Sequence, residues 1–225
     1  MKKSNIIVIA LVSLIITSLL VYYIDGKNHG KNTVANKWIE TSVVSSFTVV
    51  VVEAEADVHV IQNDTTKLKM EVVNDSSKSH INYKIINDTL HIYKGKRVYV
   101  YNKNITSIIA KKAFWVGVQF NKIDSMTFKV IDTKWFSVNN ESTKCQANKL
   151  ILSAQGSENI SFNGNLTTGK LEIDANQSYV KVYNGSIKQL EGKVVNKSGL
   201  ILYSTNIKDD IGIKKDSISQ FSIYD

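Results

Sequence analysis

The sequence predicts an all-β fold, a β-solenoid, behind one N-terminal transmembrane helix. Two observations carry this prediction: an apolar-alternating unit that recurs about every twenty residues, and an uncharged apolar run near the N-terminus. The recurring unit comprises Ile160 with Phe162, Val180 with Val182, Leu200 with Leu202, and Phe221 with Ile223. A fixed period of this size, with period-two alternation inside each unit, is typical of strands stacked in successive coils.

The apolar run extends from Ile6 to Ile24 and holds nineteen residues without a charge. At about 1.5 Å per residue it spans roughly 28 Å, which is enough to cross a bilayer. A cleavable signal peptide typically has an apolar core of only about 7 to 15 residues, followed by small residues. This run instead ends in Leu19-Leu20-Val21-Tyr22-Tyr23. We therefore expect residues 6–24 to be an uncleaved signal anchor, with cleavage near Ser18 as the alternative.

The orientation of this anchor follows from export signals more than from charge bias. Lys2 and Lys3 favour a cytoplasmic tail at residues 1–5, but two lysines soon after the run nearly balance them. A two-lysine start before an apolar run is how exported chains begin. The lone cysteine, Cys145, suits an exported protein without a structural disulfide. We expect a single-pass protein of the cell membrane whose C-terminal domain is extracytoplasmic, either periplasmic or on the cell surface.

The formal net charge of +8 does not indicate a nucleic-acid partner. All but one of the 28 basic residues are lysines, the exception being Arg97, and they are scattered along alternating strands. Nucleic-acid readers concentrate such residues on one face, whereas lysines on exposed strands discourage edge-to-edge aggregation. The positive field is compatible with an anionic glycan or lipid surface.

Beyond the anchor, residues 25–37 are polar and small and show no periodicity, and we expect a flexible tether over residues 25–43. Residues 44–225 are expected to form one elongated β-solenoid domain. Its first strand signals are β-branched or alternating runs at 47–52, 58–61, 68–73, 81–85 and 90–93. A second strand recurs in each later coil, at 150–152, 171–173, 193–195 and 211–213. Between these regions, alternation predicts that Phe114, Val116, Val118 and Phe120 form a core face, with Trp115 pointing away from it.

The order of the first strands resembles a known family. Phe47-Thr-Val-Val-Val-Val, Ala56-Asp-Val-His-Val-Ile-Gln, Leu68-Lys-Met-Glu-Val and Asn87-Asp-Thr-Leu-His-Ile-Tyr precede a repeating β region. This pattern is similar to the autotransporter-adhesin head, or GIN, domain family of Bacteroidota over roughly residues 44–225. The resemblance implies a right-handed parallel β-helix, an envelope location and no assigned enzymatic activity. Glu53-Ala54-Glu55-Ala56 stands where members are usually richer in glycine, so the chain resembles a divergent member.

No residue pattern predicts catalysis, a metal or a cofactor. Asp57 and His59 share one strand face, but no nucleophile elbow such as G-x-S-x-G accompanies them. The four histidines show no ligand spacing, and Cys145 has no partner cysteine. We therefore expect a non-enzymatic binding or adhesion module of the cell envelope. A structural or scaffold envelope protein is the alternative, and a polysaccharide-active enzyme is a distant third.

The same strand alternation predicts a candidate ligand-contact strip. If Val182, Leu202 and Ile223 point inward, Tyr183, Tyr203 and Tyr224 point outward and stack about 4.8 Å apart. The strip suits the apolar faces of a glycan or the side chains of an envelope protein, because tyrosine offers area and a hydroxyl at little entropic cost. A purely stabilising ladder is the alternative.

A second sequence motif, Asp followed by Ser or Thr and a small or aliphatic residue, resembles the O-glycosylation acceptor of Bacteroidota. The candidate acceptors are Thr65, Thr89, Ser125 and Ser217. Because Asp, Ser and Thr also favour turns through local hydrogen bonds, a purely conformational role is equally compatible with the motif.

Overall fold

The computed structural model describes residues 16–21, 23, 37–42, 46–72, 82–139 and 144–225. Residues 16–21 and 23 are helical. Among the described residues, no helix has both the length and the apolar character needed to cross a membrane. Most of the predicted anchor at 6–24, and the predicted tether up to residue 36, lie outside the described residues.

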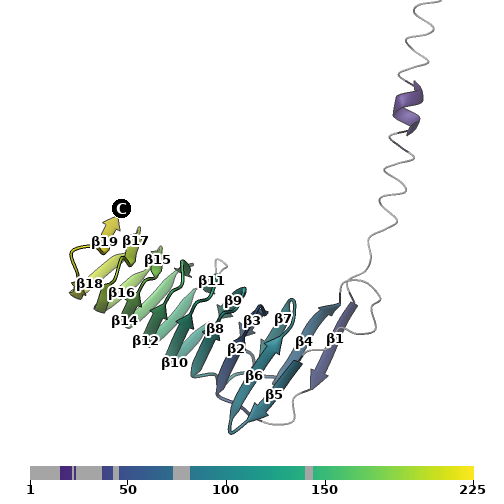
Figure 1. The fold of residues 1–225 in the computed structure, drawn as a ribbon, viewed down its shortest axis with the longest axis horizontal. Coiled ribbons are helices and arrows are strands. Elements are labelled where there is room, and N and C mark those ends of the chain that lie inside the picture. Colours follow the sequence, from purple (N-terminus) through teal and green to yellow (C-terminus); the bar gives the residue numbers. More distant parts are fainter. Residues whose placement is uncertain (1–15, 22, 24–36, 43–45, 73–81, 140–143) are drawn as a thin grey trace, which may run out of the picture. The chain divides into compact units, whose positions relative to one another are not determined.

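From residue 37 onward the described chain forms strands that belong to two sheets, one of ten strands (sheet A) and one of nine (sheet B) (Figure 1). The strands are β1 (Lys37–Ser42), β2 (Val49–Glu53), β3 (Asp57–Ile61), β4 (Lys67–Val72), β5 (Asn82–Ile86), β6 (Thr89–Lys94), β7 (Val98–Tyr101), β8 (Ser107–Lys111), β9 (Trp115–Gln119), β10 (Lys122–Ile131), β11 (Trp135–Val138), β12 (Cys145–Gln155), β13 (Asn159–Phe162), β14 (Leu166–Asn176), β15 (Tyr179–Tyr183), β16 (Ser186–Val195), β17 (Gly199–Tyr203), β18 (Asn206–Lys215) and β19 (Gln220–Tyr224). Residues 37–42 are therefore a strand, although the sequence predicts a tether there.

From β8 onward the chain is a solenoid with two strands per coil, one in each sheet. Sheet B runs β8-β10-β12-β14-β16-β18 and sheet A runs β9-β11-β13-β15-β17-β19, all in parallel. Val116 is in register with Phe136, Phe136 with Ile160, and Ile160 with Val180. The predicted solenoid is thus confirmed, and its repeat begins before Ile160.

The first coil along the chain is not the first coil in space. Strand β2 lies between β6 and β8, and β3 lies between β7 and β9, so the coil β2–β3 is inserted between two later ones. Strands β5 and β4 then pair antiparallel with β6 and β7 and close this end of the two sheets, with β1 beyond β4. The row of backbone groups that a parallel stack leaves unpaired is therefore covered here.

The core lies between the two sheets and is built from the inward residues of successive coils. Phe128 of sheet B contacts Phe136 and Phe162 of sheet A edge-on, with ring centroids 5.5 and 6.0 Å apart. The prediction that Phe114 belongs to the core is wrong, because its side chain is 49% exposed. Strand β9 begins only at Trp115, and Phe114 lies in the corner before it. Alternation predicts side-chain direction only inside a strand.

One corner of the solenoid carries a column of buried hydroxyl groups, which we call the corner ladder. Its members are Thr133, Ser157, Ser178, Ser198 and Ser219. In each step the backbone N–H of one member donates to the side-chain oxygen of the member in the next coil, at 3.0, 3.1, 3.2 and 3.2 Å. The corner ladder therefore satisfies backbone donors that would otherwise be buried without a partner.

The residue before each of the first four members has a positive φ. These residues are Asp132 (φ 49°), Gly156 (63°), Gln177 (51°) and Lys197 (64°). A left-handed residue turns the chain sharply from one sheet toward the other, and the next hydroxyl then points into the corner. This turn explains why a short polar side chain recurs at the same position of each coil.

We expect Ser178→Ala to lower the free energy of unfolding by about 1–3 kcal/mol, because it leaves the buried N–H of Ser157 without an acceptor. The matched control is Ser153→Ala on the exposed outer side of β12, which should change it by no more than about 0.5 kcal/mol. Urea unfolding of the full chain measures both. Equal losses in the two variants would show that the corner ladder contributes nothing specific.

Candidate ligand-binding face

The outer face of sheet A carries the three tyrosines of the predicted strip on neighbouring strands. Tyr183, Tyr203 and Tyr224 are in register on β15, β17 and β19. Their ring centroids lie 4.9 and 5.4 Å apart, with interplanar angles of 7° and 17°. The rings are thus stacked, and Tyr224 is 48% exposed while the other two are half-buried. The structure shows the stack; contact with a ligand stays a prediction.

A group of amide and hydroxyl side chains lies on the coils before this stack. The side-chain amide of Asn163 donates to Ser137 Oγ at 2.9 Å and to Ser161 Oγ at 3.0 Å. Both serines lie on the outer side of sheet A, one on β11 and one on β13. The outer face of sheet A therefore offers a flat aromatic surface beside groups that form hydrogen bonds.

A second set of rings lies on the same sheet nearer β1, and we call it the aromatic row. It consists of Trp38, Tyr99, His59 and Trp115. His59 stacks on Tyr99 at 4.5 Å and packs against Trp115 at 4.1 Å, and Trp38 meets Tyr99 edge-on at 5.3 Å. A Cβ atom on Gly117 would overlap the indole of Trp115, so the absence of a side chain at Gly117 lets this ring lie flat on the sheet.

Burial sets the protonation of His59 within the aromatic row. Loss of water contact, followed by the nearby positive charge of Arg97, lowers the pKa of His59 to about 4. Burial raises the pKa of the neighbouring Asp57 carboxyl, while Arg97 acts in the opposite direction. The Nε2 atom of His59 lies 3.8 Å from Oδ1 of Asp57. Because His59 is neutral at pH 7, this contact is not an ion pair there.

The structure brings Asp57 and His59 together, with the charge of Arg97 nearby. The rings of Tyr99 and Trp115 flank His59. In the described part of the chain, no three His, Cys, Asp or Glu side chains gather as a metal site would require. Cys145 is buried, and burial raises the pKa of its thiol, which disfavours the reactive thiolate.

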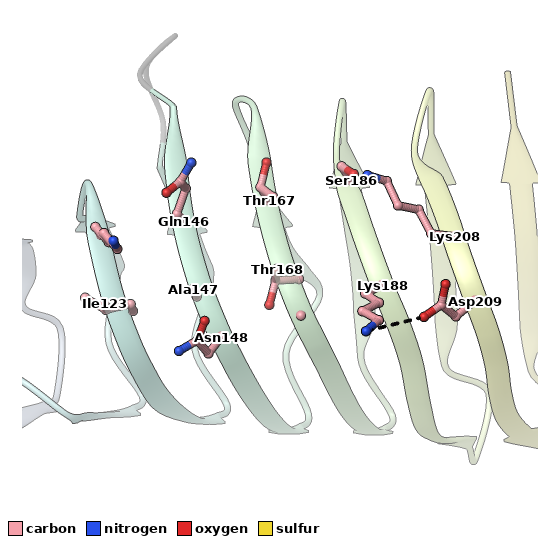
Figure 2. A pocket seen from close by; sticks show the side chains of 12 residues that line it. Ile123, Gln146, Ala147, Asn148, Thr167, Thr168, Ser186, Lys188, Lys208 and Asp209 are labelled. Carbon is pink, nitrogen blue, oxygen red and sulfur yellow. Dashed lines mark ion pairs between the residues drawn. The ribbon is translucent and has the colours of Figure 1, made fainter.

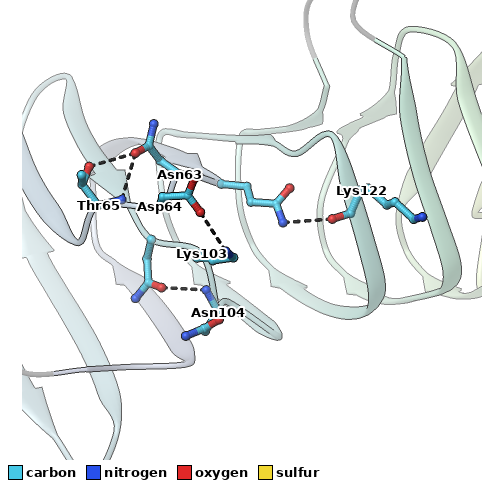
Figure 3. A network of polar contacts seen from close by, with 8 residues as sticks. Asn63, Asp64, Thr65, Lys103, Asn104 and Lys122 are labelled. Carbon is cyan, nitrogen blue, oxygen red and sulfur yellow. Dashed lines mark hydrogen bonds and ion pairs between the residues drawn. The ribbon is translucent and has the colours of Figure 1, made fainter.

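The four candidate glycosylation acceptors differ in accessibility. Thr65, Ser125 and Ser217 are exposed, and Thr89 is half-buried. The Thr65 hydroxyl donates to Asn63 Oδ1 at 2.8 Å, and the same oxygen accepts the Thr65 backbone N–H at 3.0 Å (Figure 3). These two hydrogen bonds are those of a local Asx turn at Asn63. Glycosylation of the four candidate residues remains a prediction.

A groove of about 400 Å³ opens where β10, β12, β14, β16 and β18 begin (Figure 2). Gln146, Thr167 and Ser186 line it in register, one hydrogen-bonding side chain per coil. Lys188 also lines it and lies 3.7 Å from Asp209. The sequence interpretation did not include this groove. The available signal was the recurrence of a polar side chain at each strand start, but such residues are equally typical of solvated turns.

Two solved structures with a similar fold come from Bacteroidota. A proposed adhesin from Parabacteroides distasonis aligns with a TM-score of 0.58 and 14% identity, over 84% of this chain and 97% of that chain. A proposed adhesin from Bacteroides fragilis aligns with a TM-score of 0.57 and 10% identity, over 85% of this chain and 98% of that chain. Identities this low show a shared fold alone. No protein-family model matches the chain, and a search of curated proteins finds no match.

We expect the free energy of unfolding to fall as the pH drops from 6.5 toward 4, in part because of His59. Its folded-state pKa of about 4 lies below the unfolded value of 6.5, so over this window the unfolded chain binds the proton first. One proton contributes at most about 1.4 kcal/mol per pH unit, and less here because the side chain is 32% exposed.

His59→Phe keeps a ring between Tyr99 and Trp115 and removes the titration. The stability difference between this variant and the parent chain should therefore shift in favour of the variant between pH 6.5 and 4.5. Asp57 is present in both proteins, so its own titration contributes to both stabilities and largely cancels in their difference. A stability difference that is the same at pH 6.5 and pH 4.5 would contradict the lowered pKa of His59.

Proposed function

We propose that this chain is a non-enzymatic, adhesion-type binding module of the cell envelope, anchored in the membrane, with the outer face of sheet A as its contact surface. The observation that carries the proposal is the exposed stack of Tyr183, Tyr203 and Tyr224. Membership of the GIN domain family is part of the proposal. The names of the two similar structures support adhesion, and the uncharged run at 6–24 supports anchoring.

The chemistry of this face favours a glycan as the ligand. Tyrosine rings offer rigid apolar area with a hydroxyl at the rim, which matches the mixed apolar and hydroxyl surface of a sugar ring. The rings repeat from coil to coil at 4.9 and 5.4 Å, so the surface is extended rather than a closed pocket. Asn163 and its serine partners supply hydrogen-bonding groups on the coils beside the stack.

A structural envelope role is the alternative, and one observation favours it. The stack itself stabilises the sheet, since cross-strand aromatic pairs contribute about 0.2–1 kcal/mol each. The two functions predict different effects on stability and on ligand affinity when the three tyrosine rings are removed. A scaffold loses stability without losing a ligand, whereas a binding module loses affinity.

Replacing Tyr183, Tyr203 and Tyr224 with Ser should weaken glycan binding by at least about tenfold, or about 1.4 kcal/mol. The measurement is a glycan-array screen of the full chain in lipid nanodiscs, followed by titration of the glycans that bind. Tyr93→Ser is the matched control, because Tyr93 is a half-buried outer tyrosine on sheet B, stacked on His91. A lower melting temperature with unchanged affinity in the triple variant would assign the stack to stability alone.

Protease added to spheroplasts should digest residues 40–225 while a cytosolic marker stays intact, because Lys2-Lys3 before the apolar run favours export of the C-terminal domain. Detergent-permeabilised spheroplasts provide the control in which both are digested. Protection of residues 40–225 in sealed spheroplasts would contradict the proposed orientation.

A further inference from the structure

The edge formed by β18 and β19 differs from the opposite end of the two sheets. Within the described residues, β18 pairs only with β16, and β19 pairs only with β17. At the other end, antiparallel strands cover β6 and β7. Ile211 and Ile223 belong to inward columns, yet each is 45% exposed. This edge combines unpaired backbone groups with exposed core residues, which is a template for strand pairing.

We propose that a second copy of this chain covers this edge, with β18 antiparallel to β18 and β19 antiparallel to β19 across one two-fold axis. An isologous interface of this kind needs a surface that is complementary to itself. The distribution of charge along β18 has this property. Asp209 and Asp210 lie on one side of Gly212, and Lys214 and Lys215 lie on the other.

The register follows from symmetry and charge. A two-fold axis perpendicular to the sheet leaves every side chain on its original face. Because directly opposed residues of an antiparallel pair share a face, the axis must lie midway between one residue and the same residue of the partner subunit. With Gly212 on the axis, Asp210 faces Lys214 of the partner subunit, and Ile211 faces Ile213 of the partner subunit. Moving the centre to Ile211 places Lys208 opposite Lys214 of the partner subunit, and moving it to Ile213 places the inward Ile211 opposite Lys215 of the partner subunit. Directly opposed like charges destabilise a strand pair, and of these three registers the one centred on Gly212 is the one that opposes acids with lysines and isoleucine with isoleucine.

Strand β19 fits the same axis. With Ser222 at the centre, Phe221 faces Ile223 of the partner subunit, and both residues belong to inward columns. Gly212 lies three residues before the end of β18 at Lys215, and Ser222 lies two residues after the start of β19 at Gln220. The two centres are therefore nearly equidistant from the corner that joins the strands, and one axis can serve both sheets.

This dimer has a consequence for binding. An axis perpendicular to the sheets keeps the outer face of sheet A on the same side in both copies. Two tyrosine stacks would then be presented together, and two linked sites bind an extended or repetitive ligand more tightly than one site does. The dimer itself does not depend on the identity of that ligand.

Gly212→Cys tests the axis directly in the full chain. A Cβ atom at Gly212 meets Glu191 Cγ at 3.4 Å and the Leu190 carbonyl at 4.0 Å, which are ordinary contacts, so the variant should fold. Directly opposed residues of antiparallel strands lie about 4.5–5.5 Å apart, within reach of a disulfide. Mild oxidation should therefore give a covalent dimer. Lys193→Cys, in register with Lys214 one strand further from the axis, should not crosslink, because three strand spacings alone separate it from its symmetry mate by at least about 14 Å.

A charge swap tests the register. Asp210→Lys alone and Lys214→Asp alone should each reduce the crosslinking of Gly212→Cys several-fold, and the two together should restore it, since the pairs are then reversed but complementary. Crosslinking of Gly212→Cys no greater than that of Lys193→Cys would overturn the dimer. Loss in both single variants without recovery in the double variant would overturn this register. Unchanged melting temperatures in the reduced proteins show that any loss is not unfolding.

Discussion

In-register stacking of coils is the constraint on which the structure depends. When each coil stacks in parallel on the previous one, each residue lies beside the equivalent residue of the next coil. Side chains at equivalent positions therefore form columns. A column must therefore be chemically compatible with itself. Inward columns are apolar, and the corner ladder shows that a buried polar column is also tolerated when each hydroxyl accepts a backbone N–H from the neighbouring coil. A parallel stack without this second kind of column would leave donors buried and unpaired at its corners.

The same constraint gives the two outer faces different chemistry. On sheet B, lysines and acids of neighbouring coils pair, such as Lys170 with Glu191 at 2.6 Å and Lys149 with Glu172 at 3.4 Å. Such exposed pairs contribute little energy and keep the face solvated. On sheet A, rings stack on rings from β15 to β19, and a second set stacks around β3. The outer face of sheet B is thus charged and solvated around these pairs, whereas that of sheet A carries two sets of stacked rings.

The sequence predicts the parts of this fold that repeat, and it is less informative where the chain departs from the repeat. The alternation at Val180 and Val182 predicts both inward residues, which are fully buried. Insertion of the coil β2–β3 between later coils is a long-range choice that no local pattern encodes. Phe114 has the spacing of a core residue but precedes the strand, so its ring lies outside. Ile223 has an inward position but lacks a covering coil within the described chain.

Prediction of the candidate site was limited in the same way. The tyrosine stack follows from one column of the repeat, so its geometry could be derived before the structure was known. The aromatic row could not, because Trp38, Tyr99 and His59 come from strands that meet only through the inserted coil and β1. The corner ladder is visible in the sequence as a hydroxyl residue about every twenty positions. However, Ser and Thr are so common in turns that only the hydrogen bonds reveal its role.

The central claim is that the outer face of sheet A is the contact surface, and NMR titration of the isotope-labelled chain with a glycan that binds it tests this claim most directly. The predicted result is a continuous set of shift changes that includes Tyr183, Tyr203 and Tyr224, with little change at Lys149 or Lys170 on sheet B. Changes confined to the groove around Gln146 and Thr167, with the tyrosines unaffected, would contradict it.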